Sequence, residues 1–252
     1  MIGISSTEFS TYDFNEVITE VAKQFDHWEI FAEAGHRLPN IQPRLELMKE
    51  SFNLKYSVHA PISDINIASL NERIREDSVL EILSTLESAS ALGIDTVTVH
   101  PGVCSMAVPY LEEKTIAQAK KSLRALDRIS QQYGIMVAVE NMPAFPFFIG
   151  QTAEDMNDLL DGTDLYFCLD IGHANTMDQI EPLIAAMRDR LVNVHIHDNH
   201  GQADEHLTLG EGTIDFKKVL KDLSFYDGNY IIESKSFPSG VESKEYLKGL
   251  LQ

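Results

Sequence analysis

The sequence predicts one (β/α)8 barrel that spans residues 1–252, and three observations carry this prediction. Short β-branched or aromatic runs alternate with longer amphipathic runs from one end of the chain to the other. Eight such strand–helix units are present, which is the number that closes a barrel. Most units also carry a polar residue at the same place, the end of the strand. A doubly wound open sheet has the same alternation and is the alternative fold.

The expected strands are short and mostly apolar. They are Ile2–Ser5, His27–Ala32, Tyr56–His59, Thr96–His100, Met136–Glu140, Tyr166–Asp170, Val192–His197 and Tyr230–Glu233. Apolar residues at helical spacing predict helices between them, for example within 14–25 and 79–92. Two capping-box spacings and two glycine stops agree with these helices, at Asp13/Glu16, Thr152/Asp155, Gly93 and Gly134. Long loops are expected only after the fourth, fifth and seventh strands.

Length and composition fit a globular protein with a real core. The chain has 44% hydrophobic and 23% charged residues, and no apolar run approaches the ~20 residues of a membrane span. The first residues read as a strand rather than as a signal peptide. The two cysteines, Cys104 and Cys168, suggest no disulfide framework, so a reducing cytoplasm is the expected compartment.

The formal net charge is −19 at pH 7. Nucleic-acid-binding proteins normally present a basic patch, because neutralising phosphates supplies most of their affinity. The charge therefore disfavours a nucleic-acid partner without excluding one, since bound metal ions would cancel part of it. A small-molecule substrate is the expected partner, and the sequence is equally compatible with a monomer and a homo-oligomer.

Metal-binding side chains stand at the ends of six consecutive expected strands, the third to the eighth. These side chains are His59, His100, Glu140, Asp170 with His173, His195 with His197, and Glu233. In a parallel barrel these ends meet on one rim, so residues distant in sequence share one bowl. Imidazole and carboxylate are ligands of zinc, manganese and iron. Three of the acids end otherwise apolar strands, where a buried carboxylate needs a cation or a proton.

The run from Val194 to Gly212 is the richest in such residues, with four of the nine histidines of the chain. It is expected to supply His195 to the shared bowl, and Asp204 and His206 to a second or third ion. His197 is expected to support neighbouring ligands rather than to bind metal, and His200 is expected not to bind it.

These motifs carry a resemblance to a known family. They are His59-Ala-Pro, His100-Pro-Gly, Glu140-Asn, Cys168-Leu-Asp-Ile-Gly-His173, His195-Ile-His-Asp, Asp204-Glu-His206 with Leu-Gly-Glu-Gly, and Glu233. Over nearly its whole length the chain resembles the xylose isomerase-like TIM-barrel superfamily. That superfamily joins sugar isomerases and epimerases with endonuclease IV, which belongs to AP endonuclease family 2. The resemblance implies an enzyme that uses a divalent metal, with zinc, manganese or iron as candidates.

The two branches imply different numbers of ions. The sugar epimerase branch implies one ion held by Glu140, Asp170, His195 and Glu233. The endonuclease IV branch uses three zinc ions, and its further ligands would be His59, His100, His173, Asp204 and His206. All nine positions are filled, so one to three ions are expected. Two departures favour the sugar branch: the loop after His59 lacks the nuclease's aromatic residue, and residues 141–148 form an apolar segment instead of a glycine-rich DNA-contacting loop.

Two functions follow from this resemblance. The first is isomerisation or epimerisation of a small sugar or sugar phosphate through a metal-stabilised enediolate, with Glu140 and Glu233 as acid and base. Substrate contacts would come from His173, Glu33, His36, Arg37 and Lys235, although a solvated loop explains the residues after the second strand equally well. The second function is zinc-dependent cleavage of abasic sites in DNA. Net charge and the two departures favour the sugar enzyme. A structural metal barrel is disfavoured, because this site faces an open rim.

Overall fold

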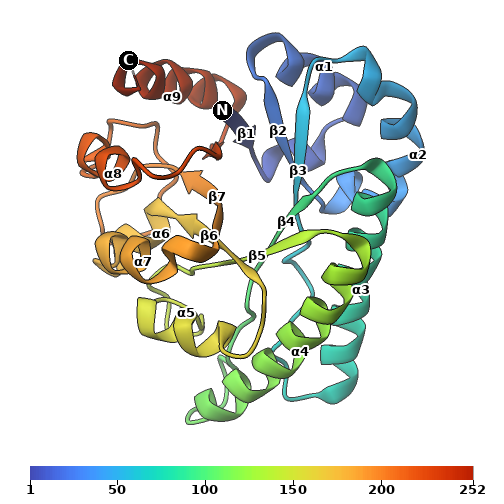
Figure 1. Cartoon of the computed structure of the whole chain (residues 1–252), viewed down its shortest axis with the longest axis vertical. Helices are drawn as coiled ribbons and strands as arrows, with labels where there is room; N and C mark the ends of the chain where they lie inside the picture. The colour runs from blue at the N-terminus through green and yellow to red at the C-terminus, as the bar shows by residue number, and fades with distance from the viewer. Residues whose placement is uncertain (252) are drawn as a thin grey trace.

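The computed structural model describes residues 1–251 and has the shape of a closed barrel. Eight parallel strands pair in sequence order, and β8 pairs with β1 to close the ring (Figure 1). The strands are β1 (Ile2–Ser5), β2 (His27–Phe31), β3 (Lys55–His59), β4 (Thr96–Val99), β5 (Met136–Glu140), β6 (Tyr166–Asp170), β7 (Leu191–Ile196) and β8 (Asn229–Glu233). The closed ring rules out the open sheet and confirms the predicted fold. Each strand ends within one residue of its expected place.

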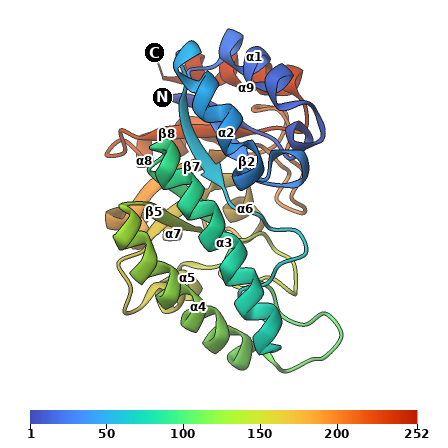
Figure 2. The same ribbon diagram turned by 90° about the vertical axis from the view of Figure 1, so that its right-hand side faces the viewer.

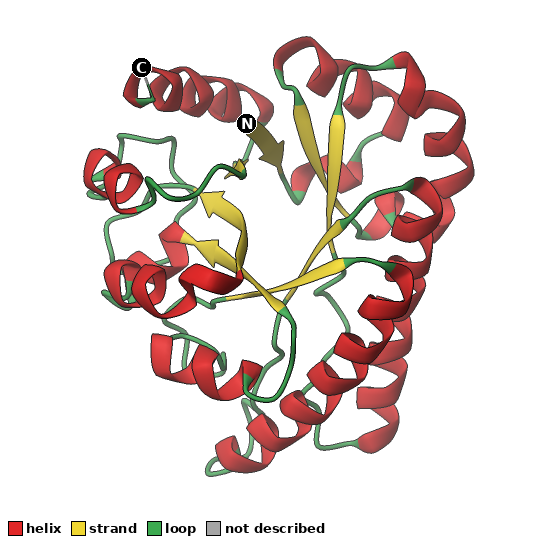
Figure 3. Ribbon diagram, in the orientation of Figure 1, coloured by secondary structure: helices red, strands yellow, loops and turns green. Residues whose placement is uncertain are grey.

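Helices cover the outside of the barrel (Figure 3). They are α1 (Phe14–Gln24), α2 (Leu38–Met48), α3 (Glu72–Leu92), α4 (Glu112–Tyr133), α5 (Ala153–Leu160), α6 (Ile171–Thr176), α7 (Ile180–Met187), α8 (Phe216–Asp222) and α9 (Phe237–Leu250), with 3₁₀ turns at Glu8–Thr11, Ala34–His36, Lys49–Ser51 and Arg188–Arg190. The first strand, β1, and the last helix, α9, lie on the same side of the barrel (Figures 1 and 2). Among the described residues, no helix is both long enough and apolar enough to cross a membrane.

The helix ends follow the sequence signals with one exception. Asp13 caps α1 by accepting a backbone N–H, but the structure shows no reciprocal bond from Glu16 within residues 1–251, so that capping box is only half formed. The expected box at the start of α5 is complete. Both glycine stops are confirmed, because Gly93 (φ +72°) and Gly134 (φ +67°) adopt the left-handed conformation that ends α3 and α4.

Four long loops leave the carboxyl ends of the strands. Three of them, residues 100–111, 141–152 and 197–215, follow β4, β5 and β7 as expected. The fourth, residues 60–71 after β3, was not expected. Its isoleucines at 65 and 67 pack against or within the core. All four loops lie at the end of the barrel where a site is expected.

Strand β2 shows how the alternation of side chains separates the helix-facing core from the barrel interior. Trp28 is fully buried and stacks on a phenylalanine of α1, with 5.4 Å between ring centroids. The next residue, Glu29, points the other way, and its carboxylate accepts hydrogen bonds from Ser57 (2.7 Å) and Asn193 (2.8 Å). Asn193 also donates to Thr98 (3.0 Å). A buried polar layer from β2, β3, β4 and β7 therefore lies beneath the rim.

Candidate metal centre

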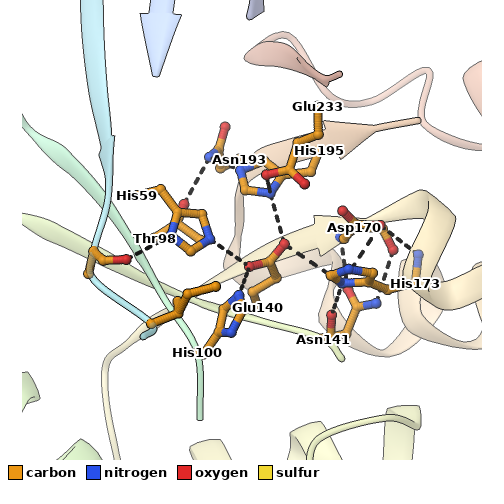
Figure 4. Close-up of polar contacts among 12 residues, drawn as sticks. His59, Thr98, His100, Glu140, Asn141, Asp170, His173, Asn193, His195 and Glu233 are labelled. Carbon is orange, nitrogen blue, oxygen red and sulfur yellow. Dashed lines mark hydrogen bonds and ion pairs between the residues drawn. The ribbon is translucent and has the colours of Figure 1, made fainter. Parts of the chain in front are cut away.

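The structure brings all nine predicted ligands together at the carboxyl ends of β3 to β8. A cavity of about 430 Å³ is lined by seven of them, His59, His100, Glu140, His173, Asp204, His206 and Glu233. The other two, Asp170 and His195, are fully buried beside these residues (Figure 4). The barrel topology alone accounts for this convergence, because the six strand ends share one rim.

Glu140 lies at the centre of the cluster. Its Oε1 atom is 2.8 Å from His195 Nδ1, and its Oε2 atom is 2.9 Å from His100 Nε2 and 3.2 Å from His59 Nε2 (Figure 4). Burial by itself would raise the pKa of the Glu140 carboxyl, but the surrounding imidazoles outweigh burial and hold its pKa well below the usual range. The Glu140 side chain is therefore an ionised carboxylate whose oxygens lie 2.8 to 3.2 Å from nitrogens of three imidazoles.

The potential ligand atoms fall into overlapping groups, each with its atoms within 4.8 Å of one another. The groups are His59/Glu140/His195/Glu233, Glu140/Asp170/His173, Asp170/His197/Glu233 and His173/His197/Asp204/His206. Three of the four ligands expected for a single ion share the first group. Asp170, the fourth, belongs instead to the two groups that adjoin the first through Glu140 and Glu233. The bowl thus offers more than one place for a cation.

Two histidines are oriented by backbone carbonyls. His59 Nδ1 lies 2.8 Å from the carbonyl oxygen of Ala60, and His173 Nδ1 lies 2.9 Å from that of Asn141. Because a carbonyl only accepts, each Nδ1 must carry the proton and donate it. In both residues Nε2, which faces the cavity, is therefore the nitrogen that is available to a metal ion once it gives up its own proton.

A carboxylate that sequence reasoning missed, Glu29, lies behind the His195 ring. The Nε2 atom of His195 lies 2.7 Å from Glu29 Oε1, while its Nδ1 atom faces Glu140 and Glu233 at 2.8 and 3.1 Å. Burial opposes ionisation of Glu29, yet the charge of His195 lowers the pKa of that carboxyl to about 2. The available signal was an acid inside an apolar strand, Trp28-Glu-Ile-Phe31. A carboxylate behind a metal-binding histidine fixes the ring and raises its basicity.

The buried charges fit a divalent cation. Five carboxylates surround the bowl, three of them buried and two partly buried: Glu29, Glu140, Asp170, Asp204 and Glu233. Within residues 1–251, three of these carboxylates have a buried oxygen without a hydrogen-bond partner: Glu29 Oε1, Asp170 Oδ2 and Asp204 Oδ1. Buried carboxylates need a compensating cation. Oxygen and imidazole donors together suit zinc, manganese or iron.

Two predicted substrate contacts, Glu33 and Arg37, do not reach this cavity. Glu33 Oε1 accepts the backbone N–H groups of Ile62 and Ser63, both at 2.6 Å. Arg37 forms a two-pronged ion pair with Glu81 of α3, at 2.6 and 2.8 Å. Both side chains line a separate pocket between the β2–α2 loop, the β3–α3 loop and α3. The charged atoms of Glu33 and Arg37 therefore already have partners within the fold. We leave both residues out of the proposed site.

His36 also lies away from the bowl. It is buried behind β2 with its ring edge-on to Phe14 and Trp28, at 5.4 and 5.8 Å between centroids. Its Nε2 atom lies 3.2 Å from the Tyr12 carbonyl oxygen. This environment makes His36 a core residue and corrects the expected substrate role. Lys235, in contrast, does line the cavity.

An apolar wall covers one side of the cavity, as the sequence predicts for residues 141–148. Phe145, Phe147 and Phe148 line it, and their rings pack on one another with centroids 4.7 to 6.0 Å apart. Met142 and Pro143 extend the same wall. The cavity therefore combines a polar, ligand-rich floor with an aromatic side.

The glycine-rich end of the β7–α8 loop supports the loop rather than binding metal. Asp198 Oδ2 accepts the backbone N–H groups of Gly210 and Gly212, each at 2.9 Å. His200 faces Glu205 at 2.9 Å on the surface of the loop and belongs to none of the ligand groups in the described chain. The loop is therefore folded around Asp198, and this holds Asp204 and His206 over the bowl.

Known proteins resemble this chain in sequence and in fold. Residues 19–250 match the family model described as xylose isomerase-like TIM barrel. An uncharacterized protein from Methanocaldococcus jannaschii is 36% identical over 261 residues, which cover 99% of this chain and 89% of that protein. A solved structure described as a D-tagatose 3-epimerase-like protein superposes with a TM-score of 0.93 at 34% identity, covering 99% of this chain and 96% of the other. A protein from Aquifex aeolicus named "Probable endonuclease 4" is 29% identical over 217 residues, covering 77% of this chain and 74% of that protein. The chain therefore belongs to the xylose isomerase-like TIM barrel family.

Proposed function

We propose that this protein is a divalent-metal-dependent epimerase or isomerase of a small sugar. The observation that carries the proposal is the pair Glu140 and Glu233, which come from β5 and β8 and both lie within about 3 Å of His195 Nδ1 at the floor of one cavity. The cavity volume of about 430 Å³ is in the range of small-molecule sites. The likeness to the D-tagatose 3-epimerase-like structure supports this reading.

The proposed reaction moves a proton on the carbon next to the sugar carbonyl. A divalent ion held by Glu140, Asp170, His195 and Glu233 would supply polarisation of that carbonyl, which makes the neighbouring C–H group more acidic. One of the two glutamates removes the proton from one face of the carbon. The other, protonated from solvent through the cavity mouth, returns a proton to the opposite face. The neighbouring imidazoles lower the pKa of both carboxyls, so the glutamate that acts as the base is ionised at neutral pH and can accept a proton.

The remaining lining residues would hold and shield the sugar. The aromatic wall of Phe145, Phe147 and Phe148 would cover one face of the sugar and exclude water from the charged intermediate. Lys235 is the proposed donor to sugar hydroxyls. Lys235 is the one lysine or arginine among the described residues that line the cavity, so we propose a free sugar rather than a sugar phosphate.

The second candidate is zinc-dependent cleavage of abasic DNA. The full set of nine ligands and the 29% identity to the Aquifex protein favour it. The net charge of −19 opposes it, because DNA affinity comes largely from neutralised phosphates. The aromatic wall also occupies the segment where a DNA-contacting loop would lie. We therefore rank it second.

The experiment that tests the proposal compares both activities in one preparation. Metal-depleted protein is reconstituted separately with zinc, manganese and iron, then offered D-tagatose and other ketohexoses, and in parallel an abasic-site duplex. We expect sugar interconversion that chelation abolishes and metal restores, with the duplex left intact. Cleavage of the duplex without turnover of any sugar would reverse the ranking.

A further inference from the structure

A smaller pocket, which we call the side pocket, adjoins the cavity of the metal centre. Its volume is about 230 Å³. Four residues line both spaces, namely Ile62, His100, Phe147 and Phe148. From these shared residues the side pocket extends toward α3, because Ile82 of that helix and Ile67 of the β3–α3 loop also line it. The two spaces therefore meet at the four shared side chains.

The lining of the side pocket is almost entirely apolar. The remaining lining residues are Pro61, Ile65, Asn66, Gly102 and Val103. Asn66 and His100 are thus the two polar side chains among the described residues that line it. The cavity of the metal centre differs, since seven of the candidate metal ligands line it. The two adjoining spaces therefore suit chemical groups of opposite polarity.

Both polar side chains of the side pocket already have partners. Asn66 Nδ2 donates to the Val103 carbonyl oxygen (2.9 Å), and its Oδ1 accepts the backbone N–H groups of Ala68 (2.9 Å) and Val103 (3.1 Å). His100 Nε2 lies 2.9 Å from Glu140 Oε2, at the floor of the neighbouring cavity (Figure 4). A hydroxyl placed in the side pocket would lose water without gaining a side-chain partner, which costs free energy. An alkyl or aryl group would instead be stabilised by leaving water.

Three loops around the side pocket are tied to one another. Gly102 of the β4–α4 loop has a φ of +105°, and a Cβ atom there would lie 2.6 to 2.9 Å from atoms of Ala68 and Asn66 in the β3–α3 loop. The β4–α4 loop also bonds to the β5–α5 loop, because the Cys104 N–H donates to the Phe147 carbonyl (2.7 Å). These contacts fix the shape of the side pocket, so a ligand does not have to order its walls.

The size of the side pocket fits a small apolar group. An apolar cavity of ~150 Å³ lined by leucine, isoleucine and phenylalanine binds benzene. At about 230 Å³, the side pocket therefore has room for a butyl or a phenyl group. Such a group would complement the side pocket in both size and polarity.

We propose that the substrate is an uncharged sugar that carries a short alkyl or aryl group, and that this group occupies the side pocket. The proposal rests on the proposed epimerase or isomerase and specifies the substrate class of the same site. His100 lines both spaces and lies beside Glu140, so the apolar group is held close to the reacting carbon. Binding of a group that does not react then fixes the position of the carbon that does.

The first test compares the affinities of ligands that differ only in the added group. Metal-loaded wild-type protein is titrated calorimetrically with D-tagatose and with its butyl and 3-hydroxypropyl ethers, attached at O1 or at O6. The two ether groups have the same number of non-hydrogen atoms, but one ends in a hydroxyl. We expect one butyl ether to bind at least ~10-fold more tightly than D-tagatose and than the matching hydroxypropyl ether. Butyl ethers that bind no more tightly than the hydroxypropyl ethers at both positions overturn the proposal.

The second test fills the side pocket. Val103→Trp places a large ring among the lining residues, so the preference for the butyl ether over D-tagatose should fall from at least ~10-fold to about 1. Val108→Trp is the matched control, because Val108 belongs to the same loop, is 52% exposed and does not line the side pocket. The control should keep the wild-type preference, and circular dichroism checks the folding of both variants. A preference that survives in folded Val103→Trp overturns the proposal, and the wild-type titration decides independently of this variant.

Turnover separates this proposal from the function on which it rests. We expect kcat/KM for the butyl ether to exceed that for D-tagatose by at least ~10-fold. Tighter binding of the butyl ether without turnover of any sugar would contradict the proposed epimerase, while supporting a sugar with an apolar group as the ligand. Epimerisation of D-tagatose without any preference for the butyl ether would overturn the role of the side pocket and leave the proposed epimerase standing.

Discussion

At the scale of single residues, His195 is held between carboxylates on both sides of its ring. Glu29 lies 2.7 Å from Nε2 within the barrel, and Glu140 and Glu233 lie 2.8 and 3.1 Å from Nδ1 at the cavity floor. Burial disfavours a charged imidazole, but the surrounding anionic groups raise the pKa of His195 well above its usual value. A metal ion at Nδ1 would take over the role of that proton, with Glu29 still holding the ring in place.

Replacing Glu29 tests this orientation. Glu29→Gln keeps the shape of the side chain but removes the charge behind His195, so we expect metal affinity to fall ~10–100-fold. Competition with a chromophoric chelator measures the affinity. Glu81→Gln, a matched change at an ion pair outside the cavity, should leave affinity unaltered. Equal affinities for Glu29→Gln and the wild type would show that Glu29 does not orient the ligand.

Replacing Glu233 tests the chemistry. Glu233→Gln removes a proton acceptor and a ligand charge at once, so sugar turnover should fall by at least ~10²-fold while the thermal unfolding transition is retained. Steady-state kinetics with the best sugar substrate gives the rate. Glu205→Gln, on the neighbouring loop, should behave like the wild type. Normal turnover by Glu233→Gln would remove Glu233 from the mechanism.

At the scale of elements, Gly172 allows α6 to pack closely against His197, the residue that follows β7. Gly172→Ala should destabilise the protein by ~1–3 kcal/mol, because its Cβ atom would fall on the buried His197 ring. Gly249, near the end of α9, is a matched control with no atom within 4 Å of a built Cβ. Gly249→Ala should stabilise the helix by ~0.5–1 kcal/mol. Urea unfolding measures both, and equal stabilities for the two variants would contradict the close approach.

Much of the fold and of the ligand set is predictable because both depend on local patterns. Each strand ends where an apolar run meets a polar residue, and barrel topology then brings residues such as His59 and Glu233 together. Other roles depend on partners that only the fold supplies. Arg37 forms an ion pair with Glu81, 44 residues away in sequence, and Glu29 accepts a hydrogen bond from Asn193, 164 residues away. No local pattern in the sequence indicates such pairs, so the sequence did not point to Glu29 and left the role of Arg37 open.

At the scale of the whole molecule, ionisable groups of the metal-free bowl lower the stability of the protein at both low and high pH. The pKa of Glu29 falls from 4.5 to about 2, because His195 outweighs burial. The pKa of His206 rises from 6.5 to about 9, because Asp204 and Glu233 outweigh burial. A lowered carboxyl pKa gives stability above pH 4.5 that is lost as the pH falls toward 2. A raised histidine pKa gives stability below pH 6.5 that is lost as the pH rises through 9.

We therefore expect Glu29 and His206 together to stabilise the metal-free protein most between about pH 4.5 and 6.5. Zinc requires neutral imidazoles, so its stabilising effect should be larger at pH 8 than at pH 6. Thermal unfolding across this range, in EDTA and in ZnCl₂, measures both effects. A metal-free melting temperature that is highest at pH 8 or above would contradict the charge arrangement.

The net charge is likewise a property of the whole molecule. The five carboxylates around the bowl are a small share of the 39 acidic residues, so the net charge of −19 stays strongly negative even when metal ions cancel them. A phosphodiester backbone would be repelled by such a surface, whereas a neutral sugar would not. The negative net charge and the size of the cavity therefore both favour a small neutral sugar as the substrate.

Proton exchange with solvent tests the central claim most directly. Metal-loaded protein is incubated with its sugar substrate in D₂O, and the product is examined for deuterium. We predict one deuterium at the epimerised carbon, incorporated only when metal is present and absent with Glu233→Gln, because a carboxyl in contact with solvent returns the proton. Epimerised product without deuterium, or incorporation that survives metal removal, would contradict a metal-dependent proton transfer between Glu140 and Glu233.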